Sequence, residues 1–282
     1  MNKPTPKPLL RSDLRLYLGQ KYFILKRHLA LRLRGIHFAV QESQAENILL
    51  PYTYHSHKTP LYRKLQNVDM RLQENKVVNL KLAVSKMNRV MVRPGQVFSF
   101  WKLVGRTTKQ QGYVKGMVLK NGAITAATGG GLCQLSNLIY WITIHSPLTV
   151  LERHRHGYDV FPDSDRSQPF GSGATCFYNY GDLMIQNNTD FTVQLDLEVN
   201  KEYLNGRWLC DVPPCFRYEI YEKEHLIKHE FWGGYTRHNI INRRKFDIDG
   251  ALMNDEFVVE NHAVMMYAPF LEEKESDFLS LP

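Results

Sequence analysis

Apolar residues recur at spacings of three and four in two stretches of the chain, which predicts two helices. The first helix is expected over residues 13–34, between a capping Ser12 and a terminating Gly35, with its apolar positions at Leu14, Leu18, Tyr22, Leu25, Leu29 and Leu33. The second is expected over residues 77–91, with Val77, Leu80, Val84, Met87 and Met91 on one face. It should end near Arg93, because Pro94-Gly95 cannot continue a helix.

The third helix is predicted from Cys133 to about Ile144, where Ser146-Pro147 ends it. Its apolar residues fall on every face of the helix, so we expect it to be buried. Three glycines, Gly129 to Gly131, directly precede it.

Shorter runs rich in β-branched and aromatic residues predict strands. We expect strands at residues 97–104, 117–119, 148–153, 174–179, 183–187 and 191–199, and further pieces such as 216–222 and 256–260. Residues 41–60 look irregular and are interpreted as a connector or an edge segment, and the tail after Phe270 is expected to be frayed. The predicted fold class is α+β, with N-terminal helices and a buried central helix following a Gly-Gly-Gly-x-Cys loop, packed on mostly antiparallel strands.

These elements suggest a division of the 282 residues into four parts. Residues 1–40 form a basic helical segment, 41–69 a connector, 70–200 the central domain, and 201–282 a β-rich extension packed on it.

The net charge of +8 lies in one segment. Residues 1–40 hold nine Lys or Arg and one acid, Asp13, whereas the other 242 residues hold 27 of each sign. We interpret residues 13–34 as a basic amphipathic helix that docks its leucine stripe on the main domain, and the alternative is that it lies on an anionic membrane surface. Nucleic acid is not expected as a partner, because no nucleic-acid-binding motif accompanies the charge.

The sequence shows no signal peptide and no transmembrane helix. The longest apolar run, Leu138–Ile144, is far shorter than the roughly 20 residues that span a bilayer. We therefore expect a cytoplasmic protein, peripheral on the membrane in the alternative above. The four cysteines should then be reduced.

Cys133 is the candidate nucleophile. A helix N-terminus stabilises negative charge and can lower a cysteine pKa from about 8.5, and a glycine loop lets a substrate approach closely. The alternative is a small buried residue beside a turn. The candidate bases are His154 and His156, at the end of the strand that follows the helix, and at most one of them should face Cys133.

No metal or cofactor is expected. His154, His156 and a cysteine lack a fixed ligand spacing and have no fourth ligand, and the single pair Cys210 and Cys215 is interpreted as structural thiols.

Five segments in order resemble the VanW family, which is named for an accessory protein of glycopeptide-resistance clusters: 94-PGQVFSFWKLVG-105, 111-QGYVKGMVLKNG-122, 129-GGGLCQLSNLIYW-141, 151-LERHRHG-157 and 181-GDLMIQNNT-189. The resemblance covers roughly residues 70–200. Some larger, exported members are associated with L,D-transpeptidation of peptidoglycan through a cysteine thioester. The resemblance therefore implies a peptidoglycan stem peptide or its precursor as the partner.

The family motifs assign roles to individual residues. Cys133 would be the nucleophile and His156 the general base, and Asp182 would orient the base or cap a turn. The substrate-binding residues would be Gly129, Gly130, Gly131, Gln134, Ser136 and Arg153, with Gln134 and the Cys133 amide as oxyanion donors and Arg153 for a substrate carboxylate.

The chain departs from the family at Gly173, where the Gly-x-Asp-Ala-Thr pattern has an acid. Three functions remain open: a cysteine acyl-transferase, a catalytically silent peptide-binding module, and a membrane-surface accessory protein.

Overall fold

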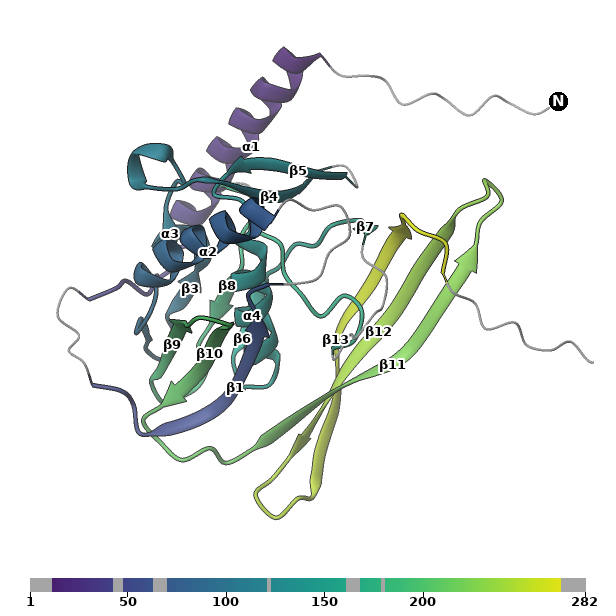
Figure 1. Cartoon of the computed structure of the whole chain (residues 1–282). Coiled ribbons are helices and arrows are strands. Elements are labelled where there is room, and N and C mark those ends of the chain that lie inside the picture. The colour runs from purple at the N-terminus through teal and green to yellow at the C-terminus, as the bar shows by residue number, and fades with distance from the viewer. Residues whose placement is uncertain are drawn as a thin grey trace, which may run out of the picture.

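The computed structural model describes residues 12–42, 48–62, 70–120, 123–160, 168–178 and 181–269 (Figure 1). Its helices are α1 (Asp13–Leu33), α2 (Met70–Ser85), the short α3 (Phe100–Val104), a 3-10 turn η1 (Lys109–Gln111) and α4 (Cys133–Ile144). Within the described ranges, no helix combines the length and the apolar character needed to cross a membrane.

Thirteen strands form four sheets in the described part of the chain. The first sheet has the order β1 (Tyr52–Pro60), β10 (Tyr203–Cys210), β9 (Val193–Val199) and β2 (Met91–Val92), and all its pairs are antiparallel. A smaller sheet joins β3 (Val97–Ser99), β8 (Met184–Gln186) and β6 (Thr149–Glu152). The hairpin of β4 (Lys115–Lys120) and β5 (Ala123–Thr128) stands alone.

The C-terminal sheet consists of the long strands β11 (Arg217–His229), β12 (Tyr235–Phe246) and β13 (Leu252–Met265). The short β7 (Tyr158–Asp159) pairs with β13 in parallel. Figure 1 shows this sheet leaning against the domain as a separate layer. The predicted α+β class, with mostly antiparallel strands, is confirmed.

Helix α4 lies at the centre of the core. Nine of its twelve residues are buried, as its apolar residues on every face predict. It packs against β1 and β10 on one side and β6 on another. The fully buried Trp208 of β10 donates a hydrogen bond to Thr143 Oγ1 of α4 (3.0 Å), so the largest core side chain also has its polar atom satisfied.

Two predicted elements have different bounds in the structure. Helix α2 begins at Met70 and ends at Ser85, because Met91 and Val92 instead pair with β9 as strand β2. The predicted strand 97–104 is a strand only to Ser99, whose hydroxyl accepts from the Lys102 amide and begins helix α3. A side-chain cap thus ends the strand that the β-branched run alone would have continued.

Other expected segments have mixed outcomes. Within the range expected to be a connector or an edge segment, Tyr52–Pro60 form β1 at the edge of the first sheet, which fits the second alternative. The run 174–179 forms no strand within its described residues beyond a single bridge between Phe177 and Gly181. The predicted pieces 216–222 and 256–260 are parts of the longer β11 and β13. The tail after Phe270 lies outside the described residues.

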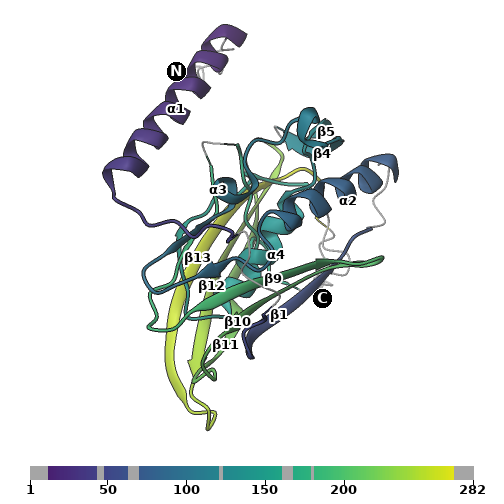
Figure 2. The same cartoon turned by 90° about the vertical axis from the view of Figure 1, so that its left-hand side faces the viewer.

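Helix α1 has the predicted extent, but its leucine stripe does not dock. The side chains of the stripe are 56–79% exposed: Leu14, Leu18, Tyr22, Leu25, Leu29 and Leu33. Figure 2 shows the helix standing apart from the sheets. The less exposed Ile24 and Leu31 lie on the side of Arg27, three and four residues from it. Apolar side chains therefore occupy two sides of the helix, an exposed side formed by the stripe and a less exposed side around Arg27.

A histidine cluster where β1 meets the end of α4 makes the fold sensitive to acid. His55 and His145 stack with ring centroids 4.1 Å apart, and burial together with His145 and His57 lowers the pKa of His55 to about 4. An unfolded histidine takes up a proton near pH 6.5, whereas folded His55 remains neutral, so stability is retained above pH 6.5 and lost as the pH falls toward 4. We expect a loss of about 1–2 kcal/mol between pH 7 and pH 5, measured by urea unfolding.

The variant His55→Gln should flatten this pH dependence. The exposed His229, outside this cluster, provides the control His229→Gln. An equally steep pH dependence in both variants would contradict the assignment to His55.

Candidate functional site

The glycine loop before α4 passes closely against the β4–β5 hairpin. A Cβ atom on Gly130 would lie 2.1 Å from the Gly116 carbonyl oxygen, so only glycine fits there. Gly129 and Gly131 have φ values of +76° and +94°, in the region that favours glycine. The buried Asn79 of α2 donates to the Gly130 oxygen (2.9 Å) and also bonds both backbone groups of Val114. Helix α2 therefore fixes the loop that leads to Cys133.

Cys133 is the first residue of α4, as predicted, but its environment differs from expectation. The side chain is partly accessible and lines a cavity. Burial raises the pKa of the Cys133 thiol. Hydrogen bonds from the amides of Cys176 and Cys133 and from the Thr175 side chain oppose this shift, but they are weaker than the effect of burial. The expectation that the helix N-terminus would lower this pKa is therefore wrong, because the desolvation that comes with burial has the larger effect.

A cavity of about 340 Å³ opens beside the thiol. Of the predicted site residues it brings together Gly131, Cys133, Gln134 and His156. Its other walls come from α2, the β4–β5 hairpin and the segments around β7 and residues 168–175, and include Gln73, Lys76, Met117, Leu119, Ile124, Asn137, Arg155, Asp159, Phe170, Gly173 and Thr175. The mixed apolar and charged lining is typical of a site for a small or peptidic ligand.

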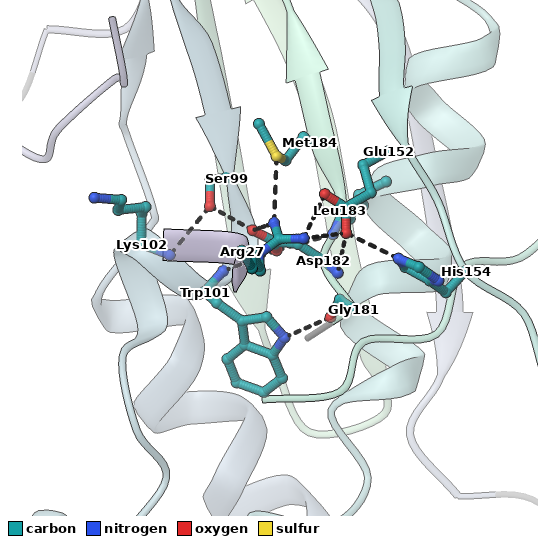
Figure 3. Close-up of polar contacts among 10 residues, drawn as sticks. All are labelled: Arg27, Ser99, Trp101, Lys102, Glu152, His154, Gly181, Asp182, Leu183 and Met184. Carbon is teal, nitrogen blue, oxygen red and sulfur yellow. Dashed lines mark hydrogen bonds and ion pairs between the residues drawn. The ribbon is translucent and has the colours of Figure 1, made fainter. Parts of the chain in front are cut away.

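The two candidate histidines point to different places. His156 lines the cavity and touches the Phe177 ring edge to face, with centroids 5.6 Å apart. Burial, together with Arg155, lowers the pKa of His156, so its imidazole is neutral at pH 7. His154 instead lies 2.8 Å from Glu152 Oε1 through Nε2, outside the cavity (Figure 3).

Two of the side chains expected to bind substrate, those of Gln134 and Ser136, have partners within the protein. The Gln134 amide donates to Thr59 Oγ1 and to the Pro60 oxygen, both at 2.9 Å, which occupies the proposed oxyanion donor. The buried Ser136 hydroxyl donates to the Ala174 oxygen (2.6 Å). Ser136, Gly129 and Gly130 do not line the cavity.

Arg153 braces the loop beside the cavity. Its guanidinium lies over the Tyr140 ring, 4.7 Å from the centroid, and donates to the carbonyl oxygens of Gly171 and Gly173. It also bonds Asn261 of β13. Arg153 therefore joins the loop that contains Gly171 and Gly173 to the C-terminal sheet. It does not line the cavity, so its position does not support the expectation that it holds a substrate carboxylate.

Asp182 is a cap in the structure. Its buried carboxylate accepts from the Ser99 hydroxyl (2.6 Å) and the Trp101 amide (3.1 Å), at the start of α3, and from Arg27 (3.3 Å) (Figure 3). Burial raises the pKa of Asp182, while these donors oppose that shift. These contacts fit the second of its two expected roles, capping a turn, and do not include His156.

The sequence reasoning missed Asn79, Asn137 and Thr175. Asn79 and Lys76 lie on the buried side of α2 with Leu80 and Val84. A polar residue at such an apolar position is the feature of the sequence that could have identified Asn79. Asn137 accepts from the Ala174 amide (2.8 Å), and a Cβ at Gly173 would lie 2.5 Å from its Oδ1. The absence of a side chain at Gly173 therefore leaves the space that Asn137 fills. This packing explains why glycine, and not the acid of the family pattern, stands at this position.

The described residues contain no group of three or more His, Cys, Asp or Glu side chains arranged to hold a metal ion. All four cysteines are free, with Cys210 buried and Cys215 exposed.

The fold and site define an α+β domain in which a glycine loop places a cysteine at the start of a buried helix, beside a cavity. Residues 75–209 match the family described as VanW like protein. Vancomycin B-type resistance protein VanW of Enterococcus faecalis is 38% identical over 171 residues, which cover 61% of this chain and 62% of that protein.

The uncharacterized protein YoaR of Bacillus subtilis is 28% identical over 112 residues, 39% of this chain and 34% of that protein. The chain thus aligns with less than two thirds of the length of either relative. No solved structure matches it significantly.

Proposed function

We propose that this protein acts in glycopeptide resistance on peptidoglycan stem peptides or their precursors, by acyl transfer through Cys133. The observation that carries the proposal is the cavity of about 340 Å³ that holds Cys133, at the start of α4, together with His156. The similarity to a vancomycin resistance protein supports the setting.

The pKa shifts favour one form of the chemistry. The pKa of Cys133 is raised and that of His156 is lowered, so at pH 7 the pair is a neutral thiol and a neutral imidazole. His156 would take the thiol proton as the sulfur attacks the substrate carbonyl carbon, and then give it to the departing amine as the C–N bond breaks. The resulting thioester passes its acyl group to an acceptor amine, and the proton lost by that amine returns to the Cys133 sulfur.

The test is to trap the acyl-enzyme. Full-length protein incubated with a stem tetrapeptide should gain the acyl mass on Cys133, detected by intact-mass measurement, and Cys133→Ala should show none. His156→Gln should slow acylation by about 100-fold or more, because a general base contributes that much. Because the resting thiol is neutral, iodoacetamide should alkylate Cys133 at pH 7 more slowly than free cysteine.

His154→Gln is the matched control, since its imidazole bonds Glu152 outside the cavity. Acylation at the wild-type rate in His156→Gln, or no adduct on Cys133 in the wild-type protein, would refute the acyl-transfer proposal.

A second function, binding of the same peptides without turnover, is favoured by two observations. The thiol has a raised pKa, and the Gln134 amide that could hold an oxyanion is already bonded to Thr59 and Pro60. Calorimetric binding of the tetrapeptide that is equal in wild type and Cys133→Ala, without any adduct, would identify this function.

A further inference from the structure

The outer face of helix α1 exposes a row of large apolar side chains. We propose that this face binds an anionic membrane surface, while Arg27 on the opposite side of the helix fastens α1 to the domain. The outer face consists of Leu14, Leu18, Tyr22, Leu25, Leu29 and Leu33, which are 56–79% exposed. The proposal is independent of the chemistry at Cys133.

Arg27 attaches the helix on its other side. A helix turns about 100° per residue, so Arg27, two residues after Leu25 and two before Leu29, points away from both. Its guanidinium contacts Glu152 (2.5 and 2.7 Å) and Asp182 (3.3 Å), which lie on β6 and just before β8 (Figure 3). The attachment therefore leaves the outer face free while it holds the helix to the domain.

The ion pair between Arg27 and Glu152 is partly buried. Although burial opposes ionisation of Glu152 most strongly, hydrogen bonds from His154 and Arg27 lower the pKa of Glu152 to about 2. The Arg27 side chain is only 14% exposed. If the outer face binds a membrane, the Arg27 contact would therefore set the orientation of the domain relative to that membrane.

The charge of α1 selects the kind of surface. Residues 14–41 contain no acid, while the helix and its end carry Arg15, Lys21, Lys26, Arg32 and Arg34 in exposed positions. These cations are spread around the helix, so those beside the leucines would reach lipid phosphates by extending their long side chains. A second copy of the same helix would bring like charges together, which disfavours self-association through this face.

The length and standing of α1 also fit this role. The helix has 21 residues, and Figures 1 and 2 both show it projecting from one end of the molecule. It is not long and apolar enough to cross a membrane, so it would lie in the interface plane with its leucines among the acyl chains.

The test is vesicle co-sedimentation of the full-length protein. We expect at least tenfold tighter binding to vesicles that contain phosphatidylglycerol than to pure phosphatidylcholine, weakening as salt is added. The variant Leu18→Glu/Leu25→Glu/Leu29→Glu should bind these vesicles about 100-fold or more weakly, because burial of each leucine in lipid contributes to the free energy of binding.

The matched control carries the same three charges elsewhere. Leu226, Phe231 and Trp232 are exposed apolar residues on the β11–β12 hairpin, and Leu226→Glu/Phe231→Glu/Trp232→Glu should keep its affinity within about fivefold. Arg27→Gln should also still bind, since its side chain points away from the lipid. All substituted residues of the first variant are exposed, so its circular dichroism spectrum should match the wild type.

Three outcomes would overturn the proposal. The first is equal vesicle binding by the α1 variant and the wild type, and the second is equal binding to both kinds of vesicle. The third is a dimer in light scattering that disappears in the α1 variant, without vesicle binding, which would make the face a contact between copies of the chain.

Discussion

Replacing Arg27 with glutamine should lower the free energy of unfolding by on the order of 3 kcal/mol, because it removes the cation from a largely buried ion pair. Glu152 and Asp182 are 21% and 3% exposed at their side chains, and without Arg27 both carboxylates would remain desolvated beside each other. Asp182 also begins α3 through Ser99 and the Trp101 amide, so the loss should spread beyond α1. Urea unfolding followed by tryptophan fluorescence measures the difference.

Lys26→Gln is the matched control, because it removes the same charge from an exposed neighbouring position. We expect a change within about 0.5 kcal/mol there. In the double variant Arg27→Gln/Glu152→Gln, the loss of stability should be smaller than the sum of the losses in the two single variants. The reason is that Glu152→Gln removes the carboxylate charge that Arg27→Gln leaves unpaired. Additive effects, or an Arg27→Gln protein as stable as the wild type, would show that the contact does not hold α1 to the domain.

Replacing Gly130 with alanine should destabilise the fold by about 3 kcal/mol, at the upper end of overpacking effects. The new methyl group would meet the backbone of Gly116 at 2.1 Å, and a strand backbone cannot rotate aside as a side chain can. The loop would shift together with the Asn79 bond to the Gly130 oxygen, and with it the start of α4. Differential scanning calorimetry measures the loss, and the alkylation rate of Cys133 should change in the same variant.

Gly157→Ala serves as the comparison, because a Cβ there meets open space and its φ is not in the left-handed region. Its unfolding temperature should stay close to that of the wild type. A Gly130→Ala protein as stable as Gly157→Ala would mean that the loop and the hairpin are not packed as closely as described.

Much of the local structure could be predicted from the sequence. The apolar periodicity of residues 13–34, and the apolar run 133–144 that ends at Ser146-Pro147, predicted helices with nearly the observed bounds, because helix formation depends on neighbouring residues and their caps. The predicted strand 97–104 was wrong after Ser99, since Asp182, about 80 residues away in the chain, accepts from the Trp101 amide and supports the start of α3. The β-branched run could not reveal that distant partner.

The candidate site shows the same division. The motif order placed Cys133 and His156 near each other, and both line the cavity. The roles expected for Arg153 and Gln134 depended on free donors, but in the structure backbone oxygens of Gly171, Gly173 and Pro60 occupy them. A side chain's type predicts what it can bond, whereas only the surrounding packing decides which of its bonds are already made.

The sequence by itself determined the α+β class, the position of Cys133 at the start of a buried helix, and the placement of all excess positive charge in the first 40 residues. Tertiary structure decided that α1 turns its leucines outward and attaches through Arg27, that Asp182 caps α3, and that the pKa of Cys133 is raised. The reason is physical: periodicity, caps and the helix terminus act over a few neighbouring residues. Burial and ion pairing depend on residues such as Glu152, Thr175 and Asp182, which only folding brings to the helices.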